Sequence, residues 1–135
     1  MTTVFVDSNV FLRFFTIDDA GQHKQAAELF QKAAARKIEL TTGPPVLFEV
    51  AWTLRSAYGQ TREQVLKVMA AIVALPCLTL TDAPIAEAAI ELATRSSQEF
   101  ADGYIAAAAP RAGASEIATF NQKHFERLDA ALYRF

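Results

Sequence analysis

Three acidic residues stand where a purely structural role is hard to assign: Asp7, Glu49 and Asp102. Asp7 directly follows the apolar run at residues 3–6 and precedes Ser8 and Asn9. A short run of β-branched and aromatic residues predicts a buried strand. Asp7 is therefore expected at the carboxyl end of that strand, where open parallel sheets bind ligands. The alternative is that Asp7 only caps the helix that follows.

Glu49 lies within residues 44–54, a predicted helix that begins with prolines and is otherwise almost entirely apolar. The positions one turn away are Val46 and Thr53, so the helix itself offers Glu49 no basic partner. An unpaired buried carboxylate is costly, which points to a function. The alternative is that the side chain of Glu49 reaches solvent at the flank of the helix.

Asp102 opens an alanine-rich helical segment, and Glu99 precedes it by three residues. This spacing places both carboxylates on one face, where they repel each other unless a cation lies between them. Glu99 has a structural alternative as the second member of a capping box that begins at Ser96. Asp102 is expected too far into the helix to cap it, which leaves a favourable interaction with the helix dipole as its alternative.

The elements that position these residues alternate between strands and helices. Strands are predicted at residues 3–6, 38–42, 77–80, 115–119 and 131–135, with helical patterns in the intervals. This alternation predicts a mostly parallel sheet of four to five strands that is covered by helices on both faces. Pro110 predicts that the alanine-rich helix kinks or stops near Ala109, and Gly113 is expected to end the segment.

Composition indicates one ordinary domain, residues 1–135, with 52% hydrophobic residues. A signal peptide and a membrane-spanning stretch are not expected, so the chain is predicted to be cytoplasmic. The single cysteine, Cys77, excludes a disulfide scaffold and a cysteine metal site. The net charge of −2 argues against a bulk nucleic-acid binder. Six basic residues could still line a groove, or could be ordinary solvated residues: Arg13, Arg55, Arg95, Arg111, Lys123 and Arg127.

The order and spacing of four short motifs resemble PIN-domain ribonucleases of the VapC toxin type. The motifs are Asp7-Ser8-Asn9 after the first strand, Glu49 on an apolar helix, Phe100-Ala101-Asp102, and Ile117-Ala118-Thr119-Phe120-Asn121 followed by Phe125. The resemblance covers essentially the whole chain and implies a PIN-like three-layer α/β/α sandwich. It also implies that Asp7, Glu49 and Asp102 gather at one end of the sheet and hold Mg²⁺ or Mn²⁺.

The resemblance implies specific roles and one departure. Asp7 and Asp102 would be the principal metal ligands, and Glu49 a ligand or a base toward the attacking water. Asn121 stands where many relatives carry an Asp, which predicts weaker binding of the ion and argues against a second one, while Glu99 could replace part of the missing charge. Glu99 and Asn121 would thus be secondary members of the site. Hydrogen bonds that orient these groups would come from three residues: Ser8, Asn9 and Thr119.

Carboxylate oxygens are the ligands that Mg²⁺ and Mn²⁺ prefer, and such an ion lowers the pKa of a bound water that can attack phosphorus. The resemblance therefore implies hydrolysis of RNA. It also implies a homodimer and a small antitoxin partner, whose Arg would enter the acidic cleft in place of the metal.

Two alternatives differ in class. A haloacid-dehalogenase-like phosphatase also places an Asp after its first strand and uses Mg²⁺, but it needs a second acid where this chain has Asn9. A PIN-like module that has lost catalysis and only binds RNA or a protein is compatible with Asn121. Retention of the acids at positions 7, 49, 99 and 102 favours the enzyme.

Overall fold

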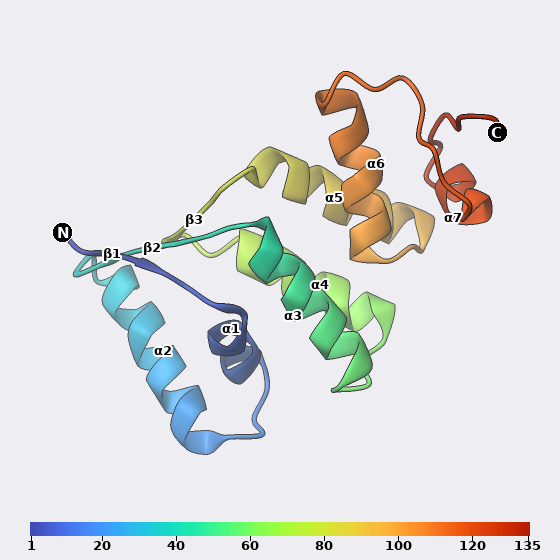
Figure 1. Cartoon of the computed structure of the whole chain (residues 1–135). Coiled ribbons are helices and arrows are strands. Elements are labelled where there is room, and N and C mark those ends of the chain that lie inside the picture. The colour runs from blue at the N-terminus through green and yellow to red at the C-terminus, as the bar shows by residue number, and fades with distance from the viewer.

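The computed structural model describes all 135 residues, and its three strands form one parallel sheet (Figure 1). The strands are β1 (Thr3–Phe5), β2 (Glu39–Thr42) and β3 (Leu78–Leu80), in the order β1-β2-β3. Phe5 pairs with Thr41, and Thr41 pairs with Thr79. The first strand is therefore an edge strand, with one side open.

Seven helices connect and extend the strands, and none is long and apolar enough to cross a lipid bilayer. Pro44 begins its helix in the first turn, and Thr61 and Gln64 form a capping box that begins another. The helices are α1 (Ser8–Phe15), α2 (Ala20–Ala34), α3 (Pro44–Ser56), α4 (Arg62–Val73), α5 (Ala83–Ser96), α6 (Phe100–Arg111) and α7 (Gln122–Arg127).

Helices cover only one face of the sheet. Val6, Leu40 and Leu80 point to the buried face, whereas Phe5 and Thr79 point to an open one. The chain steps in one direction from β1 to β2 to β3, so right-handed crossovers place the first four helices on the same face. The expectation of helices on both faces is wrong for this structure, because α5 and α6 extend away from the sheet instead of crossing back over it (Figure 1).

The predicted strands at 115–119 and 131–135 do not join the sheet. They form a single parallel bridge between Ile117 and Leu132, beside α6 and α7 and far from β1 in Figure 1. The sheet therefore has three strands, not the four to five that the sequence predicted. The residue types favour extended structure, but a strand also needs a neighbouring edge, and α6 leads this segment away from the open edge of β1.

The helix α6 runs through Pro110 and ends at Arg111, two residues beyond the predicted end. Gly113 follows with a φ of +82°, a backbone conformation that glycine adopts without strain. The expectation that Gly113 terminates the segment is confirmed.

A continuous core of 21 buried residues joins the first helices to α5 and α6. Phe30 packs against the rings of Phe11 and Phe14, which fixes α2 on α1. Farther along the chain, α5 and α6 approach closely at Gly103. A Cβ atom on Gly103 would lie 2.5 Å from the carbonyl oxygen of Ala89 and 3.0 Å from the Cβ of Ala93.

Gly103→Ala is therefore expected to destabilise the protein by about 1–3 kcal/mol, because the added methyl group forces α5 and α6 apart. Gly21→Ala is the matched control, since the nearest atom to its new Cβ lies 3.6 Å away. In the helix α2 that control is expected to be neutral or to stabilise by about 0.5–1 kcal/mol. Urea unfolding measures both, and equal midpoints for the two variants would contradict the close approach of these helices.

Candidate active site

Asp7 lies at the carboxyl end of β1, as predicted, separated from the strand only by Val6, and is also the N-cap residue of α1. Its Oδ1 accepts a hydrogen bond of 2.7 Å from the backbone N–H of Ser8. The capping interpretation and the site interpretation therefore apply to the same carboxylate, which remains exposed to solvent. The side chain of Ser8 is buried beneath it, and Asn9 is exposed on the first turn of α1.

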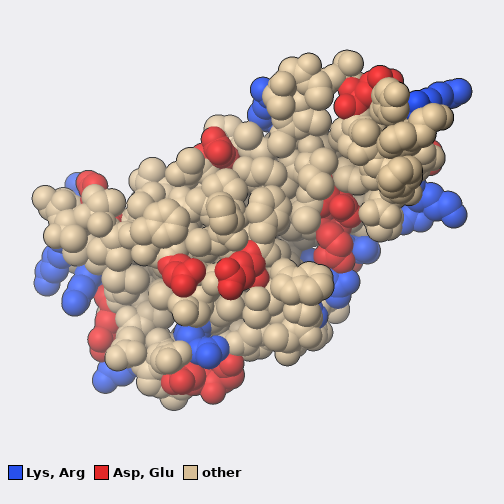
Figure 2. All heavy atoms as spheres, viewed as in Figure 1, with Lys and Arg blue, Asp and Glu red and all other residues tan.

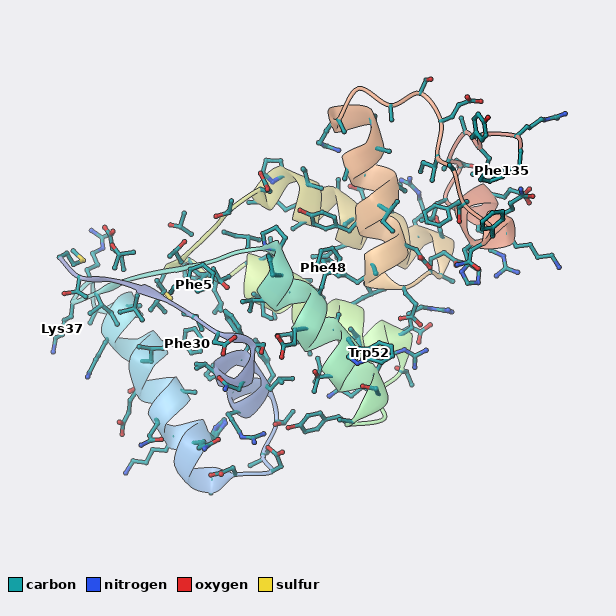
Figure 3. All side chains as sticks on the ribbon, in the orientation of Figure 1. Phe5, Phe30, Lys37, Phe48, Trp52 and Phe135 are labelled. Atoms are coloured by element: carbon teal, nitrogen blue, oxygen red, sulfur yellow. The ribbon has the colours of Figure 1, made fainter.

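Glu49 is exposed and makes no ion pair or side-chain hydrogen bond. Along α3 it shares the solvent face with Pro45, Trp52 and Ser56, while Leu47 and its neighbours form the buried face. The expectation that Glu49 is buried among apolar residues is wrong. The four residues recur at helical spacing on the side of α3 that faces solvent, and this side looks apolar in the sequence because it includes the large aromatic Trp52. Figure 3 shows Trp52 on this helix.

Asp102 lies in the first turn of α6, closer to the helix start than the sequence suggested, because α6 begins only at Phe100. A carboxylate is favoured there by the helix dipole. Its side chain is 20% exposed, and Oδ2 lies 3.5 Å from Nδ1 of His124 on α7. No local pattern predicts this pair, because Asp102 and His124 lie on different helices.

Glu99 is held by Arg55 from α3. Nη2 and Nε of Arg55 donate to Oε1 of Glu99 over 2.8 and 3.1 Å, and these hydrogen bonds raise the pKa of the Arg55 guanidinium. The capping-box alternative for Glu99 is wrong, because Ser96 is the last residue of α5 and Glu99 is the residue directly before α6. Arg55 lies 44 residues away, so no local pattern could reveal this pair.

Arg55, Glu99 and Asp102 line one groove of about 690 Å³ between α3 and α6. Aromatic rings form part of its wall, including Phe48, whose ring centroid lies 5.5 Å from that of Phe100. The groove therefore places an arginine and two acids beside an apolar surface.

The last motif lies beyond this groove. The backbone N–H of Asn121 donates to Oγ1 of Thr119 over 3.0 Å, and the side chain of Asn121 is exposed before α7. This hydrogen bond orients the backbone at Asn121, and the role of Thr119 in orienting a side chain of the site stays a prediction.

Two of the predicted basic groove residues are engaged elsewhere. Arg13 pairs with Asp18 at 3.1 Å, and Arg95 lies 3.6 Å from Glu91. The hydroxyl of Tyr58 also donates to Asp18 and is the main reason that the pKa of this carboxyl lies below its usual range. Arg13 therefore stabilises the loop between α1 and α2.

The four acids come from three different elements and do not form one cluster. Asp7 is the N-cap residue of α1, Glu49 lies on α3, and Glu99 and Asp102 flank the start of α6. Figure 2 likewise shows acidic side chains in several places on this face. No three His, Cys, Asp or Glu side chains stand close enough to hold one metal ion. The carboxylate chemistry suits Mg²⁺ or Mn²⁺, but the spacing within a single copy does not.

In open parallel α/β sheets, ligands bind at the carboxyl ends of the strands, which is where Asp7 lies. The chain belongs to the PIN domain family, whose model matches residues 4–131. A search of curated proteins returned no match. PIN domains are generally metal-dependent nucleases that act on RNA, which supports a nuclease and hydrolase role for this chain. The match gives no support to the haloacid-dehalogenase-like alternative.

Proposed function

We propose that this protein is a divalent-metal-dependent endoribonuclease and the toxin of a type II toxin-antitoxin pair. The observation that carries the proposal is the PIN match over residues 4–131, which spans Asp7, Glu49 and Asp102. The position of Asp7 at the carboxyl end of β1 supports it, since ligands of parallel sheets bind at that end.

The proposed roles follow the chemistry of each side chain. Asp7 and Asp102 are the principal ligands of Mg²⁺ or Mn²⁺, and Glu99 and Asn121 are secondary members of the site. Glu49 is a further ligand or the base that accepts a proton from the attacking water. Its carboxylate has no partner in the structure, so it is free to take either role.

The proposed partners are an RNA substrate, a second copy of this chain and a small antitoxin protein, all in the cytoplasm. The ion pair of Arg55 with Glu99 supports the proposal of an antitoxin partner, because in this pair a guanidinium binds an acid of the groove through two nitrogens. An antitoxin arginine would bind the remaining carboxylates in the same way.

The dispersal of the acids favours one competing function, a PIN-like module that binds RNA without cutting it. We expect the wild-type protein with Mn²⁺ to cut single-stranded RNA internally and to leave para-nitrophenyl phosphate intact. RNA binding without cleavage would establish the module instead, and hydrolysis of the small ester alone would establish a phosphatase.

Growth arrest on induced expression, relieved by Asp7→Asn, tests the toxin role.

A further inference from the structure

The open edge of β1 carries unpaired backbone groups. The carbonyl of Thr2 accepts from Glu39 N–H, and the N–H of Val6 donates to the Thr41 carbonyl, each over 2.9 Å. Backbone groups of a strand alternate between its two sides, so Thr3 and Phe5 direct their N–H and C=O groups away from β2. An edge of this kind accepts another strand.

The segment around Ile117 carries the complementary set. The N–H of Ile117 donates to Ala131 over 2.8 Å, and its carbonyl accepts from Tyr133 over 2.9 Å. By the same alternation, Glu116 and Ala118 direct their backbone groups away from this bridge, and neither makes a backbone hydrogen bond. A strand-like segment without a sheet and a sheet edge without a strand thus occur in one molecule.

Exposed apolar side chains gather on the same two regions. Phe5 is 61% exposed on the open face of the sheet. At the other end of the molecule, Phe120 is 87% and Phe135 73% exposed, and their rings stack with centroids 4.7 Å apart. Ile105 is 46% exposed on α6. Figure 3 shows Phe5 and Phe135 at opposite ends of the molecule.

The chain cannot join these regions within one copy without breaking its own core. Ala86, Ala89 and Ala93 of α5 are buried in the same core cluster as Met69 of α4. Since α5 and α6 are in close contact at Gly103, moving α6 onto the open face of the sheet would pull α5 from this core. A second copy can occupy the open edge and leave every such contact intact.

The exposed area is consistent with a missing partner. A monomer of 14.8 kDa is expected to expose about 7,000 Å², and this chain exposes 8011 Å². The excess is roughly 1,000 Å², and a stable interface buries about 800 Å² on each partner.

We propose that two copies of this chain exchange their C-terminal segments, so that the 116–118 segment of each copy pairs with the open edge of β1 in the other. In the exchange the added strand runs parallel to β1, in the direction shared by the other strands, and the preceding helix α6 lies over the open face. At 12 residues, α6 is about 18 Å long, so its first turn reaches the carboxyl end of the sheet. Asp102 and Asn121 of one copy then lie beside Asp7 and Glu49 of the other, and the incomplete acidic site becomes complete.

The mass of the full chain in solution tests the exchange without reference to activity. We expect twice 14.8 kDa for the wild type by light scattering. Ala118→Pro removes one free N–H and is expected to weaken the dimer about tenfold or more, whereas Ala118→Ser keeps the N–H and the dimer. Thr3→Pro removes a donor from the open edge of β1, keeps the backbone hydrogen bonds to β2 and loses only the side-chain bond of Thr3 to Glu39, so it should act likewise. A monomeric wild type, or a dimer that both proline variants leave unchanged, would overturn the proposal.

Mixing two inactive variants tests the shared site, and this arm rests on the proposed function. Asp7→Asn and Asp102→Asn are coexpressed in equal amounts. In an exchanged dimer one site of each mixed pair combines an intact Asp7 with an intact Asp102, so cleavage should recover to about a quarter of the wild-type level. No recovery beside an active wild type would overturn the exchange. If the wild type itself cuts no RNA, the proposed function fails, and the mass measurements still decide the exchange.

Discussion

Asp7→Asn and Asp102→Asn are each expected to reduce RNA cleavage about 100-fold or more, because each removes a charged ligand of the ion and even loss of a residue that only supports a metal ligand costs about 10–100-fold. The amide keeps an oxygen that can accept the hydrogen bond from Ser8, so the start of α1 should form as in the wild type. Both side chains are accessible to solvent, and the free energy of unfolding should change by about 1 kcal/mol or less. Initial rates on a labelled RNA measure the loss.

The control is Glu28→Gln, which removes an exposed carboxylate from α2. This variant should retain wild-type cleavage. Thermal melts add a readout that is independent of turnover, because an ion bound by Asp7 and Asp102 raises the melting temperature of the wild type more than that of either variant. Equal shifts with Mn²⁺ in all three proteins would contradict the assignment of these two acids.

Local patterns were sufficient to predict the first three strands. Runs such as Thr3-Val4-Phe5-Val6 and Leu78-Thr79-Leu80 become strands because each has a neighbouring strand at hand, and the structure places them within a residue or two of the predicted bounds. The segment at Ile117 has similar residue types but finds no sheet edge within its own copy. Strand propensity determines whether a segment can adopt an extended conformation. Whether it pairs with a sheet depends on where the preceding helices place it.

The candidate site, like the fold, was predictable where the signal lies in neighbouring residues and not where it depends on tertiary contacts. Asp7 lies where the end of an apolar run predicts it, because that signal is contained in four consecutive residues. The exposure of Glu49 is not evident from the sequence, because the exposed Trp52 gives the solvent face of α3 an apolar composition. The pairs of Glu99 with Arg55 and of Asp102 with His124 join separate helices, so only the tertiary structure reveals them.

The chemical nature of the cleaved RNA ends separates the two routes open to a ribonuclease. Attack of water on phosphorus with departure of the 3′ oxygen leaves a 5′-phosphate and a 3′-hydroxyl, whereas attack by the RNA 2′-hydroxyl leaves a cyclic phosphate. The second route needs a paired acid and base. The two histidines provide no such pair, since His23 contacts the carbonyl of Arg13 on α1 and His124 contacts Asp102 at the start of α6.

End-labelling of RNA cut by the wild-type protein in Mg²⁺ or Mn²⁺ is therefore the most direct test of acid-based, metal-dependent hydrolysis. We expect 5′-phosphate and 3′-hydroxyl ends, continued cleavage when the 2′-hydroxyl at the cut site is replaced by hydrogen, and complete loss of cleavage in excess EDTA. A cyclic phosphate at the cut, or cleavage that persists in EDTA, would show that Asp7, Glu49 and Asp102 are not the catalytic residues.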